Sequence, residues 1–187
     1  PEYAANGPLR GSKWNLYEAG IRVPLLVRWP GHVKADSVCD VPVSGTDLFP
    51  TFCEVAGGNC DSLTLDGQSL VPLLEGKAAA WQTRPLTWHF PYYHPEKGYE
   101  TAKETIGVND FAVSKTRPVS AIRSGNWKLL QFYETGKREL YDLSSDPGEL
   151  HDLSASQPEQ AAQLGTQLKQ MLQDMQARYP TAAASQK

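Results

Sequence analysis

Two short stretches of the sequence carry side chains suited to ligand chemistry. The first holds Lys13, in the glycine-flanked run Gly11-Ser12-Lys13. A lysine ammonium is a compact charge on a flexible stem, so it can meet an anionic oxygen and stabilise negative charge on a leaving group. Taken alone, a lysine in a glycine-rich loop is usually a solvated surface charge. A role for Lys13 therefore depends on the residues around it.

The second stretch is rich in aromatic side chains and contains His89, Tyr92, Tyr93 and His94. Aromatic faces stack on sugar rings, and imidazoles donate hydrogen bonds to hydroxyl or anionic groups. These four residues are predicted to bind substrate. An aromatic mini-core beneath a long loop explains the same residues equally well.

The composition excludes several classes of protein. The 187 residues suffice for one substantial domain, or for one small domain plus part of another, and a 40% hydrophobic fraction is typical of globular proteins. A net charge of -3 does not indicate a nucleic-acid-binding surface. No apolar run approaches the roughly 18 residues that span a bilayer. The chain opens at Pro1 without a signal-peptide pattern, so it is expected to be a fragment.

The part of the chain that carries Lys13 predicts an α/β piece. Residues 1 to 20 predict a loop, and the continuous apolar run Ile21–Trp29 predicts a strand buried on both faces. Thr46 to Ala56 predicts a helix that Thr46 caps, that buries an apolar face, and that Gly57 ends. A strand followed by a helix is the α/β signature.

The rest of the chain predicts a long loop and then a small α+β unit. Residues 85–118 combine aromatic residues and prolines without periodicity, which predicts an ordered loop. Three strand-like runs separated by turn residues then predict an antiparallel meander. They are Val119–Arg123, Trp127–Tyr133 and Glu139–Leu143. An amphipathic helix follows, beginning at a capping box of Ser156 and Glu159.

The three cysteines favour neither a metal site nor a disulfide framework. Cys39, Cys53 and Cys60 are odd in number and form no C-x-x-C pair, which argues against zinc. Cys53 lies in the predicted helix and is expected to be a buried free thiol. A Cys39–Cys60 bridge stays open at this point, and no metal-ligating residue is assigned.

The residues around Lys13 resemble the second signature of type I sulfatases. In that signature a glycine-lysine stretch, matched here by Pro8–Lys13, precedes a Tyr-Glu-Gly-Gly-Ile-Arg-x-Pro run, matched by Tyr17–Pro24. Ser12 and Ala19 stand where the family commonly has glycine. Similar blocks recur further along, such as Glu139–Leu143, so the resemblance covers residues 6 to about 175.

This resemblance implies the C-terminal part of an arylsulfatase-like enzyme of the alkaline phosphatase superfamily. The parent fold is α/β. Residues 1–84 would be the last strand and helices of its core, 85–118 a loop near the substrate pocket, and 119–187 an α+β subdomain whose antiparallel sheet packs on the C-terminal helix. Lys13 would be a catalytic residue that contacts the sulfate ester. Arg10 and Arg22 would form structural ion pairs, with Glu18 as a candidate partner.

The resemblance also implies machinery outside this chain. The nucleophile of these sulfatases is a formylglycine made within Cys-x-Pro-x-Arg, and none of the three cysteines fits that pattern. Their calcium ion, bound by oxygen ligands, would likewise be held upstream. The fragment alone is therefore expected to be inactive and to contain no cofactor. Its expected partners are a sulfated small molecule or glycan, the N-terminal catalytic part of the same protein, and a second copy in a homodimer. By family analogy the compartment is periplasmic, extracellular or lysosomal.

Two alternatives remain open from the sequence. The chain would also suit another hydrolase of the same superfamily, a phosphodiesterase or phosphonate hydrolase, which differs in its upstream nucleophile. A non-catalytic glycan-binding module would use the aromatic residues around His89 and His94, but would not need the Lys13 segment.

Overall fold

The computed structural model describes residues 6–60, 62–94, 97–98, 102–103, 105–108 and 116–181. The chain divides into two compact units, one made of Pro1–Val23 with Arg84–Lys187 and the other of Pro24–Thr83. The first unit therefore joins the segment that carries Lys13 to the C-terminal half of the chain. The domain boundaries proposed after residues 84 and 118 stay predictions.

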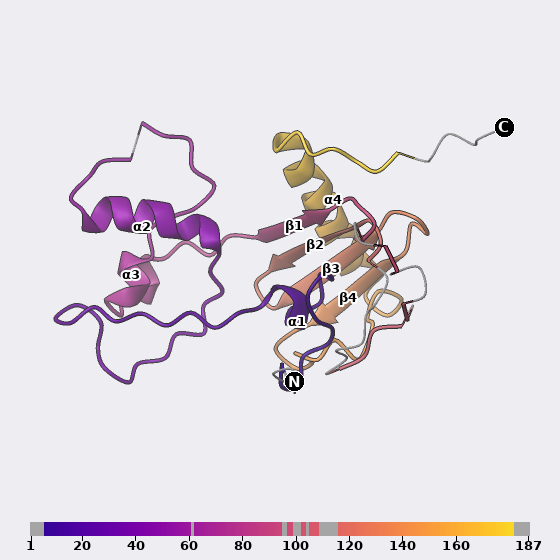
Figure 1. Cartoon of the computed structure of the whole chain (residues 1–187), viewed down its shortest axis with the longest axis horizontal. Helices are drawn as coiled ribbons and strands as arrows, with labels where there is room; N and C mark the ends of the chain where they lie inside the picture. The colour runs from indigo at the N-terminus through magenta and orange to yellow at the C-terminus, as the bar shows by residue number, and fades with distance from the viewer. Residues whose placement is uncertain are drawn as a thin grey trace. The chain divides into compact units, whose positions relative to one another are not determined.

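The first unit is built on a four-stranded antiparallel sheet in the order β1-β2-β3-β4 (Figure 1). The strands are β1 Leu86–Phe90, β2 Val119–Ser124, β3 Trp127–Phe132 and β4 Arg138–Asp142. The turn between β2 and β3 contains Gly125 at φ +59°, a left-handed conformation that glycine adopts without strain. The predicted meander is confirmed.

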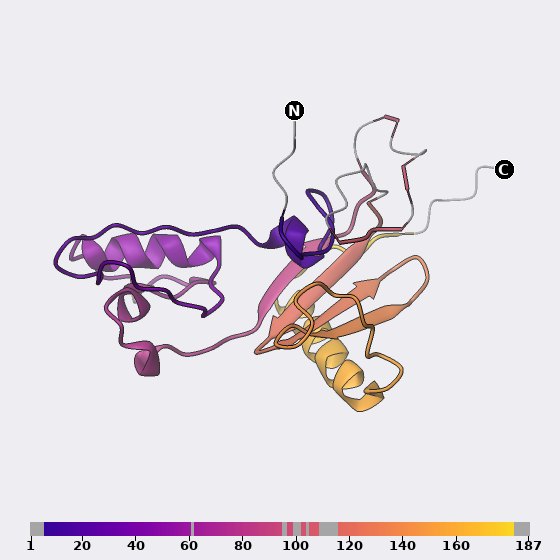
Figure 2. The same cartoon turned by 90° about the horizontal axis from the view of Figure 1, so that it is seen from below.

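Both faces of this sheet are covered, because successive side chains of a strand point to opposite faces. On one face Ile122, Leu129 and Leu140 pack against helix α4, Pro158–Asp174. On the other face Ala121, Leu130 and Tyr141 pack around Tyr17, next to the short helix α1, Glu18–Ile21. Figure 2 shows α4 and α1 on opposite sides of the sheet. The small α+β subdomain is thus confirmed, and the N-terminal segment covers its second face.

The predicted C-terminal helix is confirmed, but its predicted cap is wrong. Gln157 occupies the N-cap without a side-chain hydrogen bond, and the Ser156 hydroxyl instead donates to the Leu153 carbonyl at 3.2 Å. That bond holds Ser156 in the preceding turn, so its hydroxyl is not available to the helix. No helix within the described residues is both long and apolar enough to cross a membrane.

The segment predicted to be one long loop begins with a strand. Leu86–Phe90 pairs with β2 from Leu86 opposite Arg123 to Phe90 opposite Val119. Only Leu86 of this strand is fully buried, and the next four residues are half-buried on both faces. Without an alternation of buried and exposed positions, the sequence lacks the period-two signal of a strand.

The described residues of the second unit form two α-helices and two 3-10 turns. They are η1 Gly45–Asp47, α2 Leu48–Val55, α3 Val71–Leu74 and η2 Ala78–Ala80. The predicted helix is confirmed, but Asp47 rather than Thr46 occupies the N-cap of α2, and a capping box of Ser44 and Asp47 closes the preceding turn η1. Asp47 is fully buried, and its carboxylate accepts hydrogen bonds from the Ser44 amide at 2.8 Å and the Gln68 amide at 2.9 Å. One buried carboxylate thus organises both the start of α2 and the segment that leads to α3.

The cysteine predictions are wrong in their pairing. Cys53 forms a disulfide with Cys60, and Cys39 is a free, exposed cysteine. The chain turns sharply after α2, where the Gly58 amide donates to the Cys53 carbonyl at 2.8 Å and Gly57 takes a φ of +72°. This turn brings Cys60 back to the end of the helix, and the helical pattern around Cys53 does not reveal it.

The strand predicted over Ile21–Trp29 is absent. Ile21 ends α1, and the described residues that follow form no strand up to Trp29. A strand needs a neighbour for its backbone hydrogen bonds, and none of the four described strands pairs with this run. Its apolar side chains are therefore exposed, with Leu26 93% accessible. The apolar face of α2 is exposed too, including Phe49 and Phe52, whereas the helix buries Pro50 and Thr51.

We predict that the isolated chain self-associates through the exposed apolar run at residues 23–27. Unpaired backbone and contiguous apolar side chains favour pairing with a second chain. Leu26→Lys should shift the chain toward the monomer in size-exclusion chromatography with light scattering. Gln163→Lys, which adds the same charge at an exposed position of α4, should leave the oligomeric state unchanged. A strictly monomeric wild-type chain at high concentration would contradict this prediction.

Candidate functional site

Lys13 lies in a short loop at the start of the first unit, and its side chain is exposed. Its ammonium group rests 4.9 Å from the centre of the Trp14 ring, within the range of a cation–π contact. The described structure thus presents the Lys13 charge at the surface, with an aromatic ring beside it.

The backbone of this loop is tightly constrained. Gly11 has a φ of +84°, and a Cβ atom there would overlap the Asn15 side chain. A Cβ atom on Gly20 would overlap the Asn15 carbonyl. Gly11 and Gly20 therefore allow the close approach of these backbone segments. Trp14 has a φ of +81°, a conformation that costs a non-glycine residue about 1 to 3 kcal/mol.

A buried ion cluster fastens the loop to the sheet. Lys128 of β3 is fully buried, and its Nζ lies 2.9 Å from Glu18 Oε1 and 2.9 Å from Glu149 Oε1. Arg123 of β2 lies 3.5 Å from the other Glu18 oxygen. Buried charges are tolerated only when they are paired, so each member of the cluster requires the others. Glu18 directly follows the Lys13 loop, and this cluster therefore holds the loop in place.

Glu149 is as deeply buried as Lys128. Its Oε2 accepts a 2.7 Å hydrogen bond from the Glu18 amide, while its Oε1 meets Lys128 as an ion pair without hydrogen-bond geometry. Burial raises the pKa of the Glu149 carboxyl, and the Lys128 ammonium and the Glu18 amide oppose that shift. The Glu149 backbone takes a φ of +52°. Both the backbone conformation and the side chain of Glu149 thus serve to bind the N-terminal segment.

Arg10 forms a second set of contacts that hold the loop, but these contacts do not include the expected partner, Glu18. Its guanidinium donates to the Ile106 carbonyl at 2.7 Å, the Tyr141 hydroxyl at 3.0 Å and the Glu149 carbonyl at 3.1 Å. It also lies 4.0 Å from the centre of the Tyr17 ring. The prediction of a structural role for Arg10 is confirmed, with partners on the sheet side. The Arg22 side chain is exposed.

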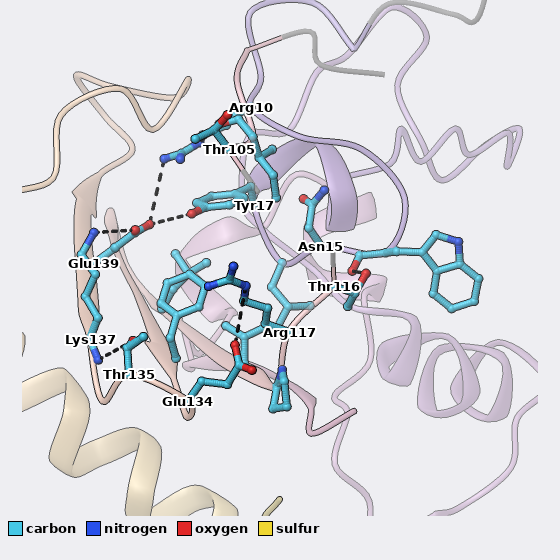
Figure 3. Close-up of a pocket in the computed structure, with 17 residues that line it drawn as sticks. Arg10, Asn15, Tyr17, Thr105, Thr116, Arg117, Glu134, Thr135, Lys137 and Glu139 are labelled. Atoms are coloured by element: carbon cyan, nitrogen blue, oxygen red, sulfur yellow. Dashed lines mark hydrogen bonds and ion pairs between the residues drawn. The ribbon is translucent and has the colours of Figure 1, made fainter. Parts of the chain in front are cut away.

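A cavity of about 280 Å³ lies between the loop and the sheet (Figure 3). Its apolar wall contains Tyr17, Val119, Leu130 and Phe132. In Figure 3 dashed lines join the Glu139 carboxylate to Arg10, Tyr17 and Lys137. The Nε atom of Arg117 lies 3.5 Å from Oε2 of Glu134. The charged side chains in Figure 3 pair with one another, and these pairs stabilise the walls of the cavity.

Several protein groups donate hydrogen bonds to the carboxylate of Glu139. Its oxygens accept hydrogen bonds from the Tyr17 hydroxyl at 2.7 Å, the Tyr141 hydroxyl at 2.8 Å and Lys137 Nζ at 2.9 Å. Burial acts to raise the pKa of Glu139, but these hydrogen bonds outweigh it and hold the pKa below its usual value of 4.5.

The structure brings Lys13 together with part of the predicted aromatic group. The Trp14 ring lies 4.7 Å from the His94 ring and 6.4 Å from Phe90, edge-to-face in both cases. Phe90 in turn packs edge-to-face with Tyr92 at 6.0 Å. A continuous row of aromatic rings therefore starts at the Lys13 ammonium. The sequence interpretation missed Trp14 and Phe90, although Trp14 directly follows the lysine.

His89 and Tyr93 lie apart from this row. His89 Nδ1 lies 2.6 Å from the Ser120 hydroxyl and Nε2 lies 2.8 Å from the Arg178 carbonyl, with the Tyr179 ring against its edge. These contacts fix β1 to the segment after α4. The Tyr93 hydroxyl donates to Glu134 at 2.5 Å. A substrate-binding role for His89, Tyr92, Tyr93 and His94 stays a prediction.

The described residues contain no group of three or more His, Cys, Asp or Glu side chains arranged to hold a metal ion.

The chain belongs to the family described as N-sulphoglucosamine sulphohydrolase, C-terminal, whose model matches residues 12–178. It is 44% identical over 165 residues to the steryl-sulfatase of Homo sapiens, covering 82% of this chain and 28% of that protein. It is 32% identical over 160 residues to a sulfatase of Formosa agariphila, covering 83% of this chain and 27% of that protein. The predicted membership of the sulfatases is confirmed, and the chain spans under a third of these curated relatives.

Solved structures show the same fold. The structure of Ps i-CgsB in complex with k-i-k-neocarrahexaose has a TM-score of 0.69 and 26% identity, over 96% of this chain and 35% of that one. A structure in complex with its substrate D-glucosamine-2-N,6-O-disulfate has a TM-score of 0.58 and 26% identity, over 78% of this chain and 27% of that one. A phosphonate monoester hydrolase from Silicibacter pomeroyi shares the fold at a TM-score of 0.54 and 22% identity, over 79% of this chain and 28% of that one.

We predict that Lys128→Met destabilises the chain by about 3 to 5 kcal/mol, because it leaves two buried carboxylates without their cation. Urea unfolding followed by circular dichroism measures the change. Lys137→Met removes a lysine that is 57% exposed and should cost only about 0 to 1 kcal/mol. Equal losses in the two variants would show that burial does not distinguish these ion pairs.

Glu139 should contribute to the pH dependence of stability. Its folded-state pKa lies below the usual 4.5, so its stabilising effect is present above that pH and is lost as the pH falls through the lower, folded value. In urea unfolding at stepped pH, Glu139→Gln should therefore be less stable than wild type at neutral pH, and the difference should shrink below pH 4.5. A difference that stays constant as the pH falls would count against this assignment.

Proposed function

We propose that this chain forms the C-terminal part of a formylglycine-dependent sulfatase that hydrolyses sulfate esters, and that Lys13 contacts the ester. The observation that carries the proposal is the match to the sulfatase family over residues 12–178. It is supported by the position of Lys13, an exposed cation on a loop that buried ion pairs hold in place. A preorganised charge of this kind stabilises developing negative charge without further reorganisation.

The rest of the machinery is proposed to lie in sequence that this chain does not span. That part would hold the formylglycine, which would supply the oxygen nucleophile that displaces the alcohol of the ester from sulfur, and the calcium ion, which would balance the charge of the sulfate oxygens. The residues of this chain would then orient the ester: the Lys13 ammonium meets a sulfuryl or leaving-group oxygen, and the aromatic row borders the substrate. The chain alone would release no sulfate.

A sulfated carbohydrate is the proposed substrate. Two structures with this fold hold a glucosamine disulfate and a neocarrahexaose, and aromatic residues that suit sugar rings lie beside Lys13. The proposed compartment is the periplasm, the lysosome or the extracellular space. The Cys53–Cys60 disulfide supports an oxidising environment.

A phosphonate or phosphodiester hydrolase is the second candidate. The fold shared with the Silicibacter pomeroyi phosphonate monoester hydrolase favours it, since the same scaffold occurs in that enzyme. A non-catalytic glycan-binding module is the third, and tight glycan binding by the isolated chain without turnover by the full-length protein would favour it.

A sulfate-release assay on the full-length, formylglycine-bearing protein tests the proposal. Lys13→Ala should reduce kcat/KM by about a hundredfold or more, as expected for loss of a group that stabilises transition-state charge. Lys169→Ala, which removes an exposed lysine of α4, should leave release unchanged. If the wild-type protein releases no sulfate from aryl or sugar sulfates but cleaves phosphonate esters, the second candidate replaces the first.

A further inference from the structure

Trp14 stands at a backbone position that suits glycine rather than tryptophan. Its φ of +81° lies in the left-handed region, which side chains with a Cβ atom rarely occupy. Strained residues persist where the surroundings enforce them, and they cluster at functional sites. A tryptophan in this conformation next to Lys13 calls for an explanation beyond the fold of the loop.

The strained backbone is held from several sides. The Trp14 carbonyl accepts a 3.0 Å hydrogen bond from the hydroxyl of Thr116, which is itself buried. The Asn15 amide donates to the Ser12 carbonyl at 3.3 Å, and the Ala19 amide donates to the Arg10 carbonyl at 3.0 Å. These bonds fix the direction in which the indole leaves the loop.

The indole ring is half-buried and lies between a cation and an imidazole. The Lys13 ammonium is 4.9 Å from its centre, and the His94 ring meets it edge-to-face at 4.7 Å. Beyond it, Phe90 and the exposed Tyr92 extend the row of rings. The indole and the rings beyond it therefore form an aromatic surface beside the Lys13 ammonium.

We propose that Trp14 is a specificity-determining residue, which stacks on the sugar ring of a saccharide sulfate while Lys13 holds the sulfate. This inference rests on the proposed sulfatase function and assigns the residue that would recognise the sugar ring. Without substrate the ammonium lies over the ring. An anionic sulfate attracts the ammonium more strongly than the ring does, so the bound ester draws Lys13 away and leaves the indole free for the C–H face of the sugar.

The neighbours of the indole favour a sugar over a plain aryl group. An aryl ring would also stack on Trp14, but it offers few groups for the polar atoms nearby. The phenol of the exposed Tyr92 can hydrogen-bond to hydroxyl groups. A hydroxyl-rich ring on Trp14 would offer hydroxyl groups to this phenol, whereas a plain aryl ring would not.

Steady-state kinetics of the full-length protein tests the inference, with glucosamine 6-sulfate, 4-nitrophenyl sulfate and inorganic sulfate as probes. Trp14→Gly relieves the backbone strain, so the variant should fold. It should raise KM for the sugar sulfate by about tenfold with a smaller change in kcat, as expected for a lost stacking contact. Trp14→Phe should recover most of that loss. Competitive inhibition by inorganic sulfate should weaken in Lys13→Ala but not in Trp14→Gly.

The outcomes separate this inference from the proposed function. An unchanged KM for the sugar sulfate in Trp14→Gly would overturn the stacking role while leaving the sulfatase proposal intact. A loss confined to the aryl sulfate would overturn the assignment to saccharides. Loss of sulfate inhibition in Trp14→Gly would show that Trp14 only shapes Lys13. Absence of turnover by the wild-type protein on both esters would instead remove the proposed function on which the inference rests.

Discussion

The first unit depends on one buried cation. Lys128 points from β3 into the interior and meets carboxylates from two distant parts of the chain, Glu18 beside the Lys13 loop and Glu149 after β4. A buried ammonium without partners strongly destabilises the fold, and so does a buried carboxylate. The three groups therefore stabilise one another, and the observed arrangement satisfies them by placing the N-terminal segment on the sheet. The position of Lys13 follows from that placement.

Apolar packing covers one face of the sheet, and on the other face polar pairing is added to it. The face toward α4 is closed by aliphatic side chains such as Leu129 and Leu164, which need no particular orientation to be satisfied. The face toward the N-terminal segment adds directional contacts, including Arg10 and Glu139. Hydrogen bonds fix a segment in one register, which hydrophobic contact alone does not do. The more precise face is the one that carries the candidate site.

The sequence predicted those elements whose signals are local. Turn residues delimit the meander, and helical spacing of apolar residues defines α4. The strand β1 was missed because it is half-buried on both faces, and the strand at Ile21–Trp29 was wrongly predicted because apolar content alone does not supply a neighbour. For the site, the signature motif identified Lys13. The role of Lys128 had no local signal, since its partner Glu18 is 110 residues away.

That same separation has a consequence for the order in which the protein forms. During synthesis the segment bearing Lys13 leaves the ribosome long before β3 and the turn that carries Glu149. Contacts between such distant parts of the chain close only after the intervening sequence has been ordered. The loop consequently reaches its fixed shape among the last events of folding, once the turn after β4 has emerged. A product truncated before that turn would contain the Lys13 sequence and yet lack the groups that hold the loop in place.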